Sequence, residues 1–403
     1  MKICIFTETY CPVVGGGETQ ARLLAEGLVA TGHSIAILTR RSDASLKEYE
    51  KYGNVNVYRV PPVGSGQLKK WGLLLSSLPK LIQLRHQYDL IFVSGYRIIG
   101  LTAVLVGKLL GKRVVLKADS QGEMSGEFFA GGLKKFGISP GSLPFRTFLR
   151  FRNHVLRKAD AFSAISSEIA SEWISSEIPS NKVHLIPNSV DTDHFVPVEP
   201  GQKLAVREKL NLPRDAVIAI YTGRLVSYKG LPLLLRVWNQ ICNKRNDVLL
   251  ILAGTGGLDI HNCESDLREY VKSNKLGQYV LFTGPIQNVS EYLRAADIFV
   301  FPTENDAFPS SVVEAMACGL PVLTTPVGAI QTIITHQENG ILVEPGNEAQ
   351  LFEALDVMLS DEELISRLGR AGRQTVCAHY SAASATTQYI SLFQDTLQPK
   401  GTK

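Results

Sequence analysis

The segment AVIAIYTGRLVSYKGLPLLLRVWNQI, residues 216–241, predicts a strand, a loop and a helix in succession. Its first part is a nearly continuous apolar run, which is typical of a strand buried on both faces of a parallel sheet. Gly223 and Gly230 flank the loop, and a leucine-rich helical pattern follows. A strand that leads through a short loop into a helix favours an open α/β sheet.

The same alternation of strands and helices runs through the rest of the chain. Prolines and turn-forming residues gather without periodicity at residues 186–203, which we interpret as a linker. We therefore predict two Rossmann-like parallel-sheet domains, residues 1–190 and 191–380, that face each other across a cleft. A C-terminal helix at about 381–403 is expected to pack back on the first domain. The other predicted strands are KICIFTE, SIAILTR, VNVYRVP, LIFVSG, RVVLKAD, AFSAIS, VHLIPN, VLLILAGTG, VLFTG, DIFVFP, PVLTTP and GILVEP.

Composition and charge favour a soluble protein with an anionic partner. Of the 403 residues, 45 % are hydrophobic and 20 % are charged, as in ordinary globular proteins. Residues 1–195 contain 24 Lys and Arg against 16 Asp and Glu, whereas the remainder is acidic on balance. A basic half suits a membrane surface or a phosphorylated acceptor, although scattered surface lysines would give the same excess. The N-terminus has too short an apolar stretch for a signal peptide, so we expect a cytoplasmic protein.

The loop between residues 223 and 230 contains two cations, Arg224 and Lys229, five positions apart. It leaves the carboxyl end of a strand, which is where ligands of such sheets bind. An arginine can bind phosphate oxygens through two N–H groups, and a lysine adds a point charge. The pair therefore suits a diphosphate, with two solvated loop cations as the alternative.

The segment TENDAFPSSVVEAMACG, residues 303–319, places Asp306 and Glu314 on either side of a predicted helix start. One interpretation is a capping box, in which Ser311 caps the helix and Glu314 reaches back to its N–H group. The other is a sugar–phosphate site, in which the helix N-terminus binds phosphate and the carboxylates bind hydroxyl groups.

Three consecutive glycines, Gly15, Gly16 and Gly17, follow the first predicted strand. They permit a loop that approaches a ligand closely, and a tight strand–helix turn is the alternative. The dinucleotide pattern G-x-G-x-x-G is absent from this position.

GRLVSYKG followed by FPTENDAFPSSVVEAMACGLPVL resembles the retaining glycosyltransferases of family 4, which have the GT-B fold. PVVGGGETQARLLAEGLVATGH and IPNSVDTDHF extend the resemblance over most of the chain. It implies transfer of a hexose-type sugar from a nucleotide-diphosphate sugar to an acceptor hydroxyl with retention of configuration, without a metal or other cofactor. Polysaccharide or glycolipid assembly is the expected setting.

The resemblance also implies roles for particular residues. Arg224 and Lys229 would neutralise the diphosphate, Glu314 would bind the ribose hydroxyls, and Asp306 would meet the donor sugar. The glycine loop itself suggests a segment that wraps the leaving group of the donor or the acceptor, and we place Gly16 and Gly17 in the donor site. The complete predicted donor site is Gly16, Gly17, Arg224, Lys229, Asp306, Ala307, Phe308, Pro309, Ser310, Ser311 and Glu314.

The chain departs from the family pattern in two places. The family has Glu followed by Gly-Phe-Gly where this chain has Asp306 and then Ala-Phe-Pro, so the donor sugar cannot be inferred. A histidine that many relatives carry after the fifth strand is replaced by a stretch with Lys117, Asp119 and Glu123. We take Asp119 and Lys117 as candidates for contact with the acceptor or the sugar, and a structural loop as the alternative. Asp119 is also a catalytic candidate together with Arg224, Lys229 and Asp306.

Asp191 and Asp193 form a D-x-D pattern that binds a metal in other glycosyltransferases. Two carboxylates at this spacing can hold a magnesium ion that bridges phosphates. Because they lie in the predicted linker and two cations are available elsewhere, we expect no metal.

Residues 66–86 and 145–158 combine basic and apolar side chains as an interfacial helix would, and an ordinary amphipathic surface helix is the alternative. The expected partners are a nucleotide-diphosphate sugar, a glycan or lipid-linked acceptor and, at the periphery, an anionic membrane, but no nucleic acid. A catalytically inactive nucleotide-sugar binding subunit, or a GT-B epimerase or phosphorylase, remains the alternative function. The residues that suggest membrane contact are Lys69, Lys70, Trp71, Lys80, Arg146, Arg150, Arg152, Arg157 and Lys158.

Overall fold

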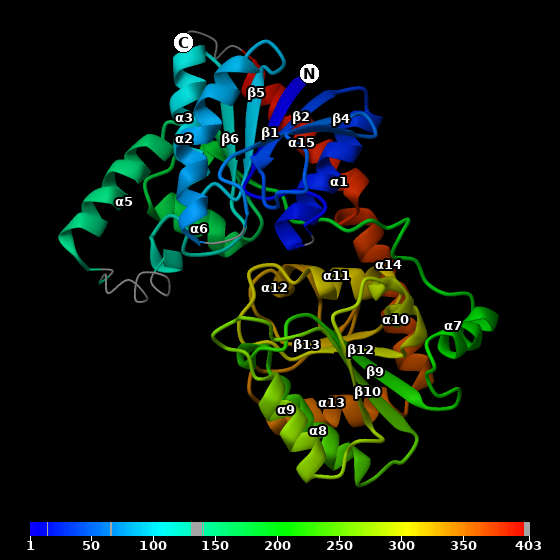
Figure 1. Cartoon of the computed structure of the whole chain (residues 1–403). Coiled ribbons are helices and arrows are strands. Elements are labelled where there is room, and N and C mark those ends of the chain that lie inside the picture. The colour runs from blue at the N-terminus through cyan, green and yellow to red at the C-terminus, as the bar shows by residue number, and fades with distance from the viewer. Residues whose placement is uncertain (14, 65–66, 130–138, 140, 399–403) are drawn as a thin grey trace. The chain divides into compact units, whose positions relative to one another are not determined.

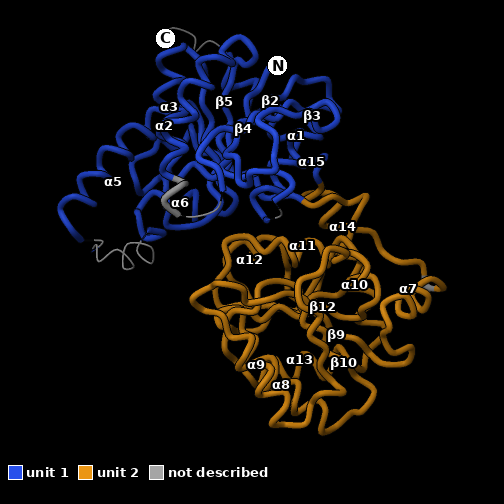
Figure 2. The backbone as a smooth tube through the Cα atoms, viewed as in Figure 1, with its two compact units in different colours: residues 1–189, 382–403 blue, residues 190–381 orange. Residues whose placement is uncertain are grey.

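The computed structural model divides the chain into two compact units, which we describe separately (Figure 2). Unit 1 contains residues 1–189 and 382–403, and unit 2 contains residues 190–381. The structure describes residues 1–13, 15–64, 67–129, 139 and 141–398, and the side chains of residues 67–70 and 200 lie outside this description. The first boundary between the units falls one residue before the predicted position at 190/191.

Unit 1 is built on an eight-stranded sheet in the order β3-β4-β2-β1-β5-β6-β7-β8. All neighbouring strands are parallel except β3, which pairs antiparallel with β4 at one edge. The strands β1, β2, β5 and β6 are almost entirely buried, as their continuous apolar sequences predict. The strands are β1 Lys2–Thr7, β2 Ser34–Arg40, β3 Tyr49–Tyr52, β4 Val55–Val60, β5 Leu90–Ser94, β6 Arg113–Lys117, β7 Ala161–Ala164 and β8 Val183–Leu185.

Helices cover both faces of this sheet, with α2, α3 and α5 side by side on one face and α1 and α15 on the other (Figure 1). Helix α15 thus packs in the unit that contains the N-terminus, where Tyr389 and Phe393 lie against Phe92 at centroid distances of 5.2 and 5.4 Å. The longer helices are α1 Gly16–Ala30, α2 Gln67–Gln83, α3 Ile99–Leu110, α5 Leu143–Leu156, α6 Ser167–Ser175 and α15 Ala382–Leu397.

Unit 2 contains a six-stranded, entirely parallel sheet in the order β11-β10-β9-β12-β13-β14. Helices α8, α9 and α13 pack together on one face, and α11 packs against α14 on the other (Figure 1). The strands are β9 Val217–Thr222, β10 Val248–Ala253, β11 Val280–Gly284, β12 Ile298–Phe301, β13 Val322–Thr324 and β14 Ile341–Leu342. The helices are α7 Lys203–Lys209, α8 Leu231–Cys242, α9 Glu264–Ser273, α10 Val289–Ala295, α11 Ser310–Ala317, α12 Ile330–Ile333, α13 Glu348–Met358 and α14 Glu362–His379.

The predicted fold class of two Rossmann-like α/β domains is therefore confirmed, and each predicted strand is found. One strand was missed. Strand β3, of sequence YEKY, is a largely exposed edge strand that lacks the apolar run by which the others were found.

Candidate active site

Lys229 is fixed at the carboxyl end of β9 by a tight approach between two loops. It ends a short 3-10 turn, Ser227–Lys229, and Gly230 follows in the left-handed conformation with φ +72°. A Cβ atom at Gly230 would overlap the carbonyl oxygen of Pro302, which follows β12. Because only glycine fits there, the end of the lysine loop lies directly against the segment that contains Asp306.

The structure brings Lys229 and Asp306 together in an ion pair. The ammonium nitrogen lies 2.7 Å from Oδ2 of Asp306 and 3.1 Å from the carbonyl oxygen of Asn305. The lysine side chain is 9 % exposed. Burial lowers its pKa below the usual value, and the opposing effect of Asp306 does not restore it. The positive charge is therefore incompletely compensated, so an additional anion would stabilise it.

Arg224 lies at the same strand end but remains largely in solvent, with a side chain that is 60 % exposed. Its guanidinium contacts the carboxylate of Asp259 and donates a 2.8 Å hydrogen bond to the hydroxyl of Tyr228. The Lys229 ammonium lies 5.2 Å from the centroid of the same Tyr228 ring. The two predicted phosphate-binding cations thus share one aromatic neighbour.

Residues 306–311 present a row of backbone donors. Among the described residues, no acceptor faces the N–H groups of Ala307, Phe308, Ser310 or Ser311. Pro309 is the residue before helix α11, which begins at Ser310 without a side-chain cap. Unpaired N–H groups at the start of a helix attract anions.

The capping-box interpretation is therefore wrong. Ser311 lies inside α11 rather than at its cap, because Pro309 takes the cap position. In the part of the chain that the structure describes, no group donates a hydrogen bond to the Glu314 carboxylate either. Burial raises the pKa of this half-buried carboxyl to about 7.

Contacts with residues 328 and 329 and with Tyr380 hold the backbone of residues 306–308 in place. The carbonyl oxygen of Ala307 accepts a 3.2 Å hydrogen bond from the N–H of Ala329. Gly328, at φ +55°, lies so close that a Cβ would overlap the carbonyl oxygen of Asp306. The Phe308 side chain is buried at a centroid distance of 6.3 Å from Tyr380. Phe308 can therefore offer a ligand its backbone and not its ring.

In unit 1 the structure brings the glycine loop and Asp119 together. Gly16 and Gly17 form the first turn of α1, and a Cβ at Gly17 would lie 3.3 Å from Oδ2 of Asp119. A Cβ at Gly95 would lie 2.5 Å from the same oxygen. These glycines leave room for the carboxylate at one wall of a pocket of about 340 Å³.

The loop that presents Asp119 is organised by a buried glutamate. Oε1 of Glu123 accepts hydrogen bonds from the N–H groups of Asp119 and Ser120, at 3.3 and 3.1 Å, and from the Ser120 hydroxyl. It also forms a 2.8 Å ion pair with Nε of Arg97. Burial raises the pKa of Glu123, although Arg97 opposes the shift. Glu123, which the sequence offered as a replacement for the missing histidine, thus acts in positioning Asp119.

Arg97 was missed by the sequence analysis. The available signal was its place two residues after the strand sequence LIFVSG, beyond the carboxyl end of β5. Glu172 was missed as well. It accepts hydrogen bonds from the N–H groups of Gly122, Met124 and Ser125, and this contact across about fifty residues leaves no local pattern.

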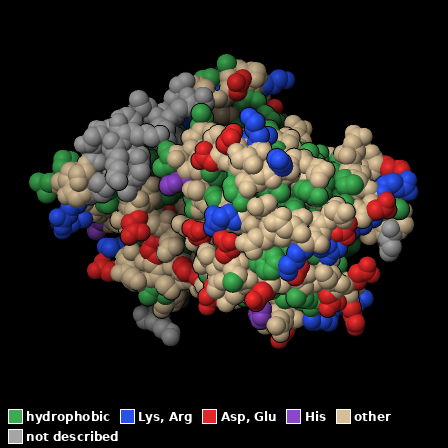
Figure 3. Space-filling view, turned by 90° about the horizontal axis from the view of Figure 1, so that it is seen from below, with side chains coloured by type: hydrophobic (Ala, Val, Ile, Leu, Met, Phe, Trp, Pro, Cys, Tyr) green, Lys and Arg blue, Asp and Glu red, His purple; other side chains and the backbone are tan. Residues whose placement is uncertain are grey.

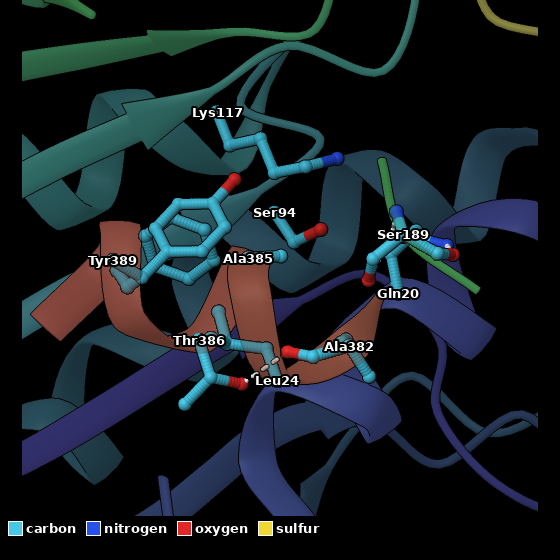
Figure 4. Close-up of a pocket in the computed structure, with 11 residues that line it drawn as sticks. Gln20, Leu24, Ser94, Lys117, Ser189, Ala382, Ala385, Thr386 and Tyr389 are labelled. Atoms are coloured by element: carbon cyan, nitrogen blue, oxygen red, sulfur yellow. Dashed lines mark hydrogen bonds between the residues drawn. The ribbon is translucent and has the colours of Figure 1, made fainter. Parts of the chain in front are cut away.

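Lys117 lies at the wall of a small internal cavity (Figure 4). Its nearly buried ammonium lies 3.1 Å from Oδ1 of Asp119. Burial favours the neutral lysine, but Asp119 and other neighbours raise the pKa of Lys117 above its usual value on balance. Gln20 and Ser189 line the same cavity, where the Gln20 amide is hydrogen-bonded to the Ser189 backbone at 2.7 and 2.8 Å.

Asp191 has a structural contact in its turn. Its Oδ1 accepts hydrogen bonds from the N–H groups of Asp193 and His194, both at 3.1 Å. Among the described residues, three or more His, Cys, Asp or Glu side chains nowhere gather as a metal site would need.

The helices proposed for membrane contact differ in detail from the expectation. Arg152 is completely buried and donates to the carbonyl oxygens of Glu123 and Met124, so it is not a lipid-facing cation. Gly66 and the side chains of Lys69 and Lys70 lie outside the described residues. The helices that the structure describes include none long and apolar enough to cross a membrane. Acidic and basic side chains are interspersed on the face of the molecule that Figure 3 shows.

The two-unit architecture is the GT-B fold of glycosyltransferases, as solved structures show. The sucrose-phosphate synthase of Thermosynechococcus elongatus matches with a TM-score of 0.78 and 23 % identity, over 98 % of this chain and 99 % of the other. HepE of Anabaena, solved in complex with UDP-glucose, matches with a TM-score of 0.74 and 17 % identity, over 98 % and 99 % of the two chains.

Sequence comparison adds the family. The model for group 1 glycosyl transferases matches residues 202–375, and the model for glycosyltransferase family 4 matches residues 14–194. An uncharacterized glycosyltransferase of Methanocaldococcus jannaschii is 26 % identical over the full length of both chains. The chain therefore belongs to the group 1 glycosyltransferases of family 4.

Proposed function

We propose that this glycosyltransferase moves a hexose-type sugar from a nucleotide-diphosphate sugar to an acceptor hydroxyl, with retention of configuration and without a metal. The observation that carries the donor site is the row of unpaired N–H groups at residues 307–311 beside the buried Lys229. Both features favour an anion, and Arg224 adds a second cation. The UDP-glucose bound by the structural neighbour HepE supports a donor of this class.

In this proposal the bond between the anomeric carbon and the diphosphate oxygen breaks while the acceptor oxygen bonds to that carbon. Negative charge develops on the departing diphosphate, where Lys229, Arg224 and the helix α11 N-terminus stabilise it. The acceptor proton passes to the departing phosphate oxygen. In this proposal the two cations and the backbone donors take the place of a divalent ion at the diphosphate.

The carboxylates take the hydroxyl groups of the donor and the acceptor. Glu314 accepts from the ribose, since its half-buried carboxylate has no donor among the described residues. Asp306 meets the donor sugar while it remains paired with Lys229. Unit 1 holds the acceptor, with Asp119 at the wall of the pocket and Gly16 and Gly17 in the adjoining turn. Polysaccharide or glycolipid assembly is the setting we propose.

Thermal denaturation with UDP, GDP, ADP and their hexose conjugates, in the presence of EDTA, tests the donor site. A ligand that binds only the folded protein raises the melting temperature. We expect one nucleotide family to raise it in the wild type and not in Arg224→Ala. If no nucleotide shifts the folded wild type, the donor proposal fails.

Turnover with the identified donor tests the rest of the proposal. The coupling constant of the anomeric proton in the product reports whether configuration is retained, and EDTA should leave the rate unchanged. Nucleotide-sugar binding without a transferred or hydrolysed sugar for any acceptor would indicate an inactive binding subunit instead.

A further inference from the structure

The pocket beside Asp119 continues into a second, apolar hollow. The polar part, of about 340 Å³, is lined by Thr9, Glu18 and Asp119 among others. The apolar part, of about 150 Å³, is lined by Trp71, Ile98, Ile99, Phe128 and Phe129. Glu8, Gly95 and Arg97 line both, so the two hollows share one wall and form one site with two different ends.

The polar end selects for hydrogen-bond donors. The carboxylates of Glu18 and Asp119 can only accept hydrogen bonds when ionised. Among the described residues, the Glu18 carboxylate has one hydrogen-bond donor, the hydroxyl of Thr9, and Asp119 has the Lys117 ammonium. Each carboxylate oxygen has two lone pairs, so acceptor capacity remains on both groups. Sugar hydroxyls satisfy it, whereas a phosphate would be repelled.

Arg97, at the shared wall, does not reverse this selection. Its Nε is paired with the buried carboxylate of Glu123 at 2.8 Å, and its Nη2 donates to the Ser120 hydroxyl at 3.3 Å. The guanidinium carbon lies 3.9 Å from the centroid of the Phe128 ring. The cation is therefore already paired with a carboxylate and lies over an aromatic ring, where it forms part of the wall between the two ends.

Two aromatic side chains at the apolar end are exposed to solvent. Trp71 is 41 % exposed and Phe128 is 44 % exposed. The other two tryptophans of the chain, Trp173 and Trp238, are completely buried. Aromatic and branched side chains that line a concave surface gain free energy when an apolar group covers them.

We propose that the acceptor is an amphiphilic glycoside, whose uncharged sugar occupies the polar end while an attached apolar group covers Trp71 and Phe128. This inference rests on the proposed function in one respect, namely that unit 1 binds the acceptor. It excludes free phosphorylated sugars as the preferred acceptors, because the polar end is acidic. Of the two acceptor classes proposed above, a glycan and a lipid-linked sugar, it favours an acceptor whose sugar carries an attached apolar group.

Tryptophan fluorescence of the full chain provides a direct test, because Trp71 is the tryptophan with an exposed side chain. The protein is titrated with n-octyl glycosides of glucose, galactose, mannose and N-acetylglucosamine below their micelle concentrations, with the methyl glycosides in parallel. We expect at least one octyl glycoside to change the emission and to bind at least about ten-fold more tightly than its methyl counterpart, since each buried methylene contributes about 0.8 kcal/mol. In Trp71→Phe the emission change should disappear, while calorimetry still detects binding.

Two variants distinguish binding in the apolar hollow from non-specific hydrophobic binding elsewhere on the protein. Phe128→Ala removes one lining ring and should reduce the preference for octyl over methyl by at least about three-fold. Leu75→Ala, on the same helix as Trp71, removes a side chain that is 80 % exposed and is not among the residues that line either hollow. This control should leave the preference unchanged.

Three outcomes would overturn the inference. In the first, every octyl glycoside binds no more tightly than its methyl counterpart. In the second, glucose 6-phosphate or another hexose phosphate binds most tightly. In the third, a disaccharide methyl glycoside displaces the octyl glycosides. The donor proposal is tested independently of the acceptor proposal, because the nucleotide binding that depends on Arg224 is measured without any acceptor. Either proposal, for the donor or for the acceptor, can therefore be refuted without affecting the other.

Discussion

Each unit contains a nearly buried lysine that forms an ion pair with an aspartate at the carboxyl end of a sheet. In unit 2, Lys229 lies 2.7 Å from Asp306, and in unit 1, Lys117 lies 3.1 Å from Asp119. Burial disfavours the charge on both ammonium groups, yet the pKa of Lys229 is lowered and that of Lys117 is raised. In two similar ion pairs the surroundings thus shift the pKa of the lysine in opposite directions.

The difference comes from the neighbours of each pair. Arg224 adds to the lowering of the pKa of Lys229, so two cations share the surroundings of Asp306. Around Lys117, Asp119 and Glu123 both raise the pKa. A buried ammonium whose pKa is lowered gains from an incoming anion beside unpaired backbone donors, whereas a compensated pair suits a fixed structural role. We therefore assign binding and catalysis to Lys229 and the positioning of Asp119 to Lys117.

The largest expected effect is on turnover in Lys229→Met. Loss of the ammonium should lower kcat/KM by about 10²–10³, as for other groups that stabilise transition-state charge. Steady-state kinetics with the identified donor would measure it, and circular dichroism would verify the fold. Arg224→Ala, whose side chain is largely solvated, should lose less. A Lys229→Met enzyme with near-normal turnover would remove the distinction between the two lysines.

Glu314→Gln should change how stability depends on pH, because Glu314 is a carboxyl without a paired cation in the described structure. Burial raises its pKa from 4.5 to about 7. Between these values the unfolded chain releases the proton while the folded chain keeps it, so stability falls as the pH rises through this window. The whole effect is on the order of 3 kcal/mol.

Urea unfolding at pH 4.5 and pH 8 would measure this change in both proteins. The wild type should lose more stability over this interval than Glu314→Gln. Glu304→Gln, which alters an exposed acid in the same segment, serves as the control and should follow the wild type. Equal pH dependence in all three proteins would show that Glu314 is not desolvated.

Lys117→Met should affect stability more than nucleotide binding. It would leave Asp119 without its ammonium partner, at a cost of about 2 kcal/mol, or a fall in Tm of about 4–8 °C for a unit of this size. Lys117→Met/Asp119→Asn, in which both charges are removed, should recover part of that loss. Differential scanning calorimetry measures the Tm, and a normal thermal shift with nucleotide should persist in both variants. Loss of the nucleotide shift alone would assign Lys117 a direct binding role.

Sequence reasoning predicted the strands well because most of them are buried, and continuous apolar runs mark burial. It placed Lys229 and Asp306 after different strands of one sheet, and the structure brings them into contact. It could not predict the pairing of Arg97 with Glu123, because this bond joins residues 26 positions apart, with helix α3 and strand β6 between them. It left the capping box open as an alternative, because a pattern of Ser and Glu fits such a box whether or not Pro309 takes the cap position.

The smallest expected effect concerns the surfaces of the two units. Helix α5 exposes Leu143 and Phe151 together with Arg146 and Arg150, so we expect unit 1 to bind vesicles that contain phosphatidylglycerol. Phe151→Ser should weaken cosedimentation by a few-fold, and added salt should weaken it further because it screens the arginines. Val357→Ser, at an exposed apolar position of unit 2, is the matched control and should have no effect. If the wild type does not bind these vesicles, or if Phe151→Ser binds them as tightly as the wild type does, the apolar side chains of α5 do not contact the membrane.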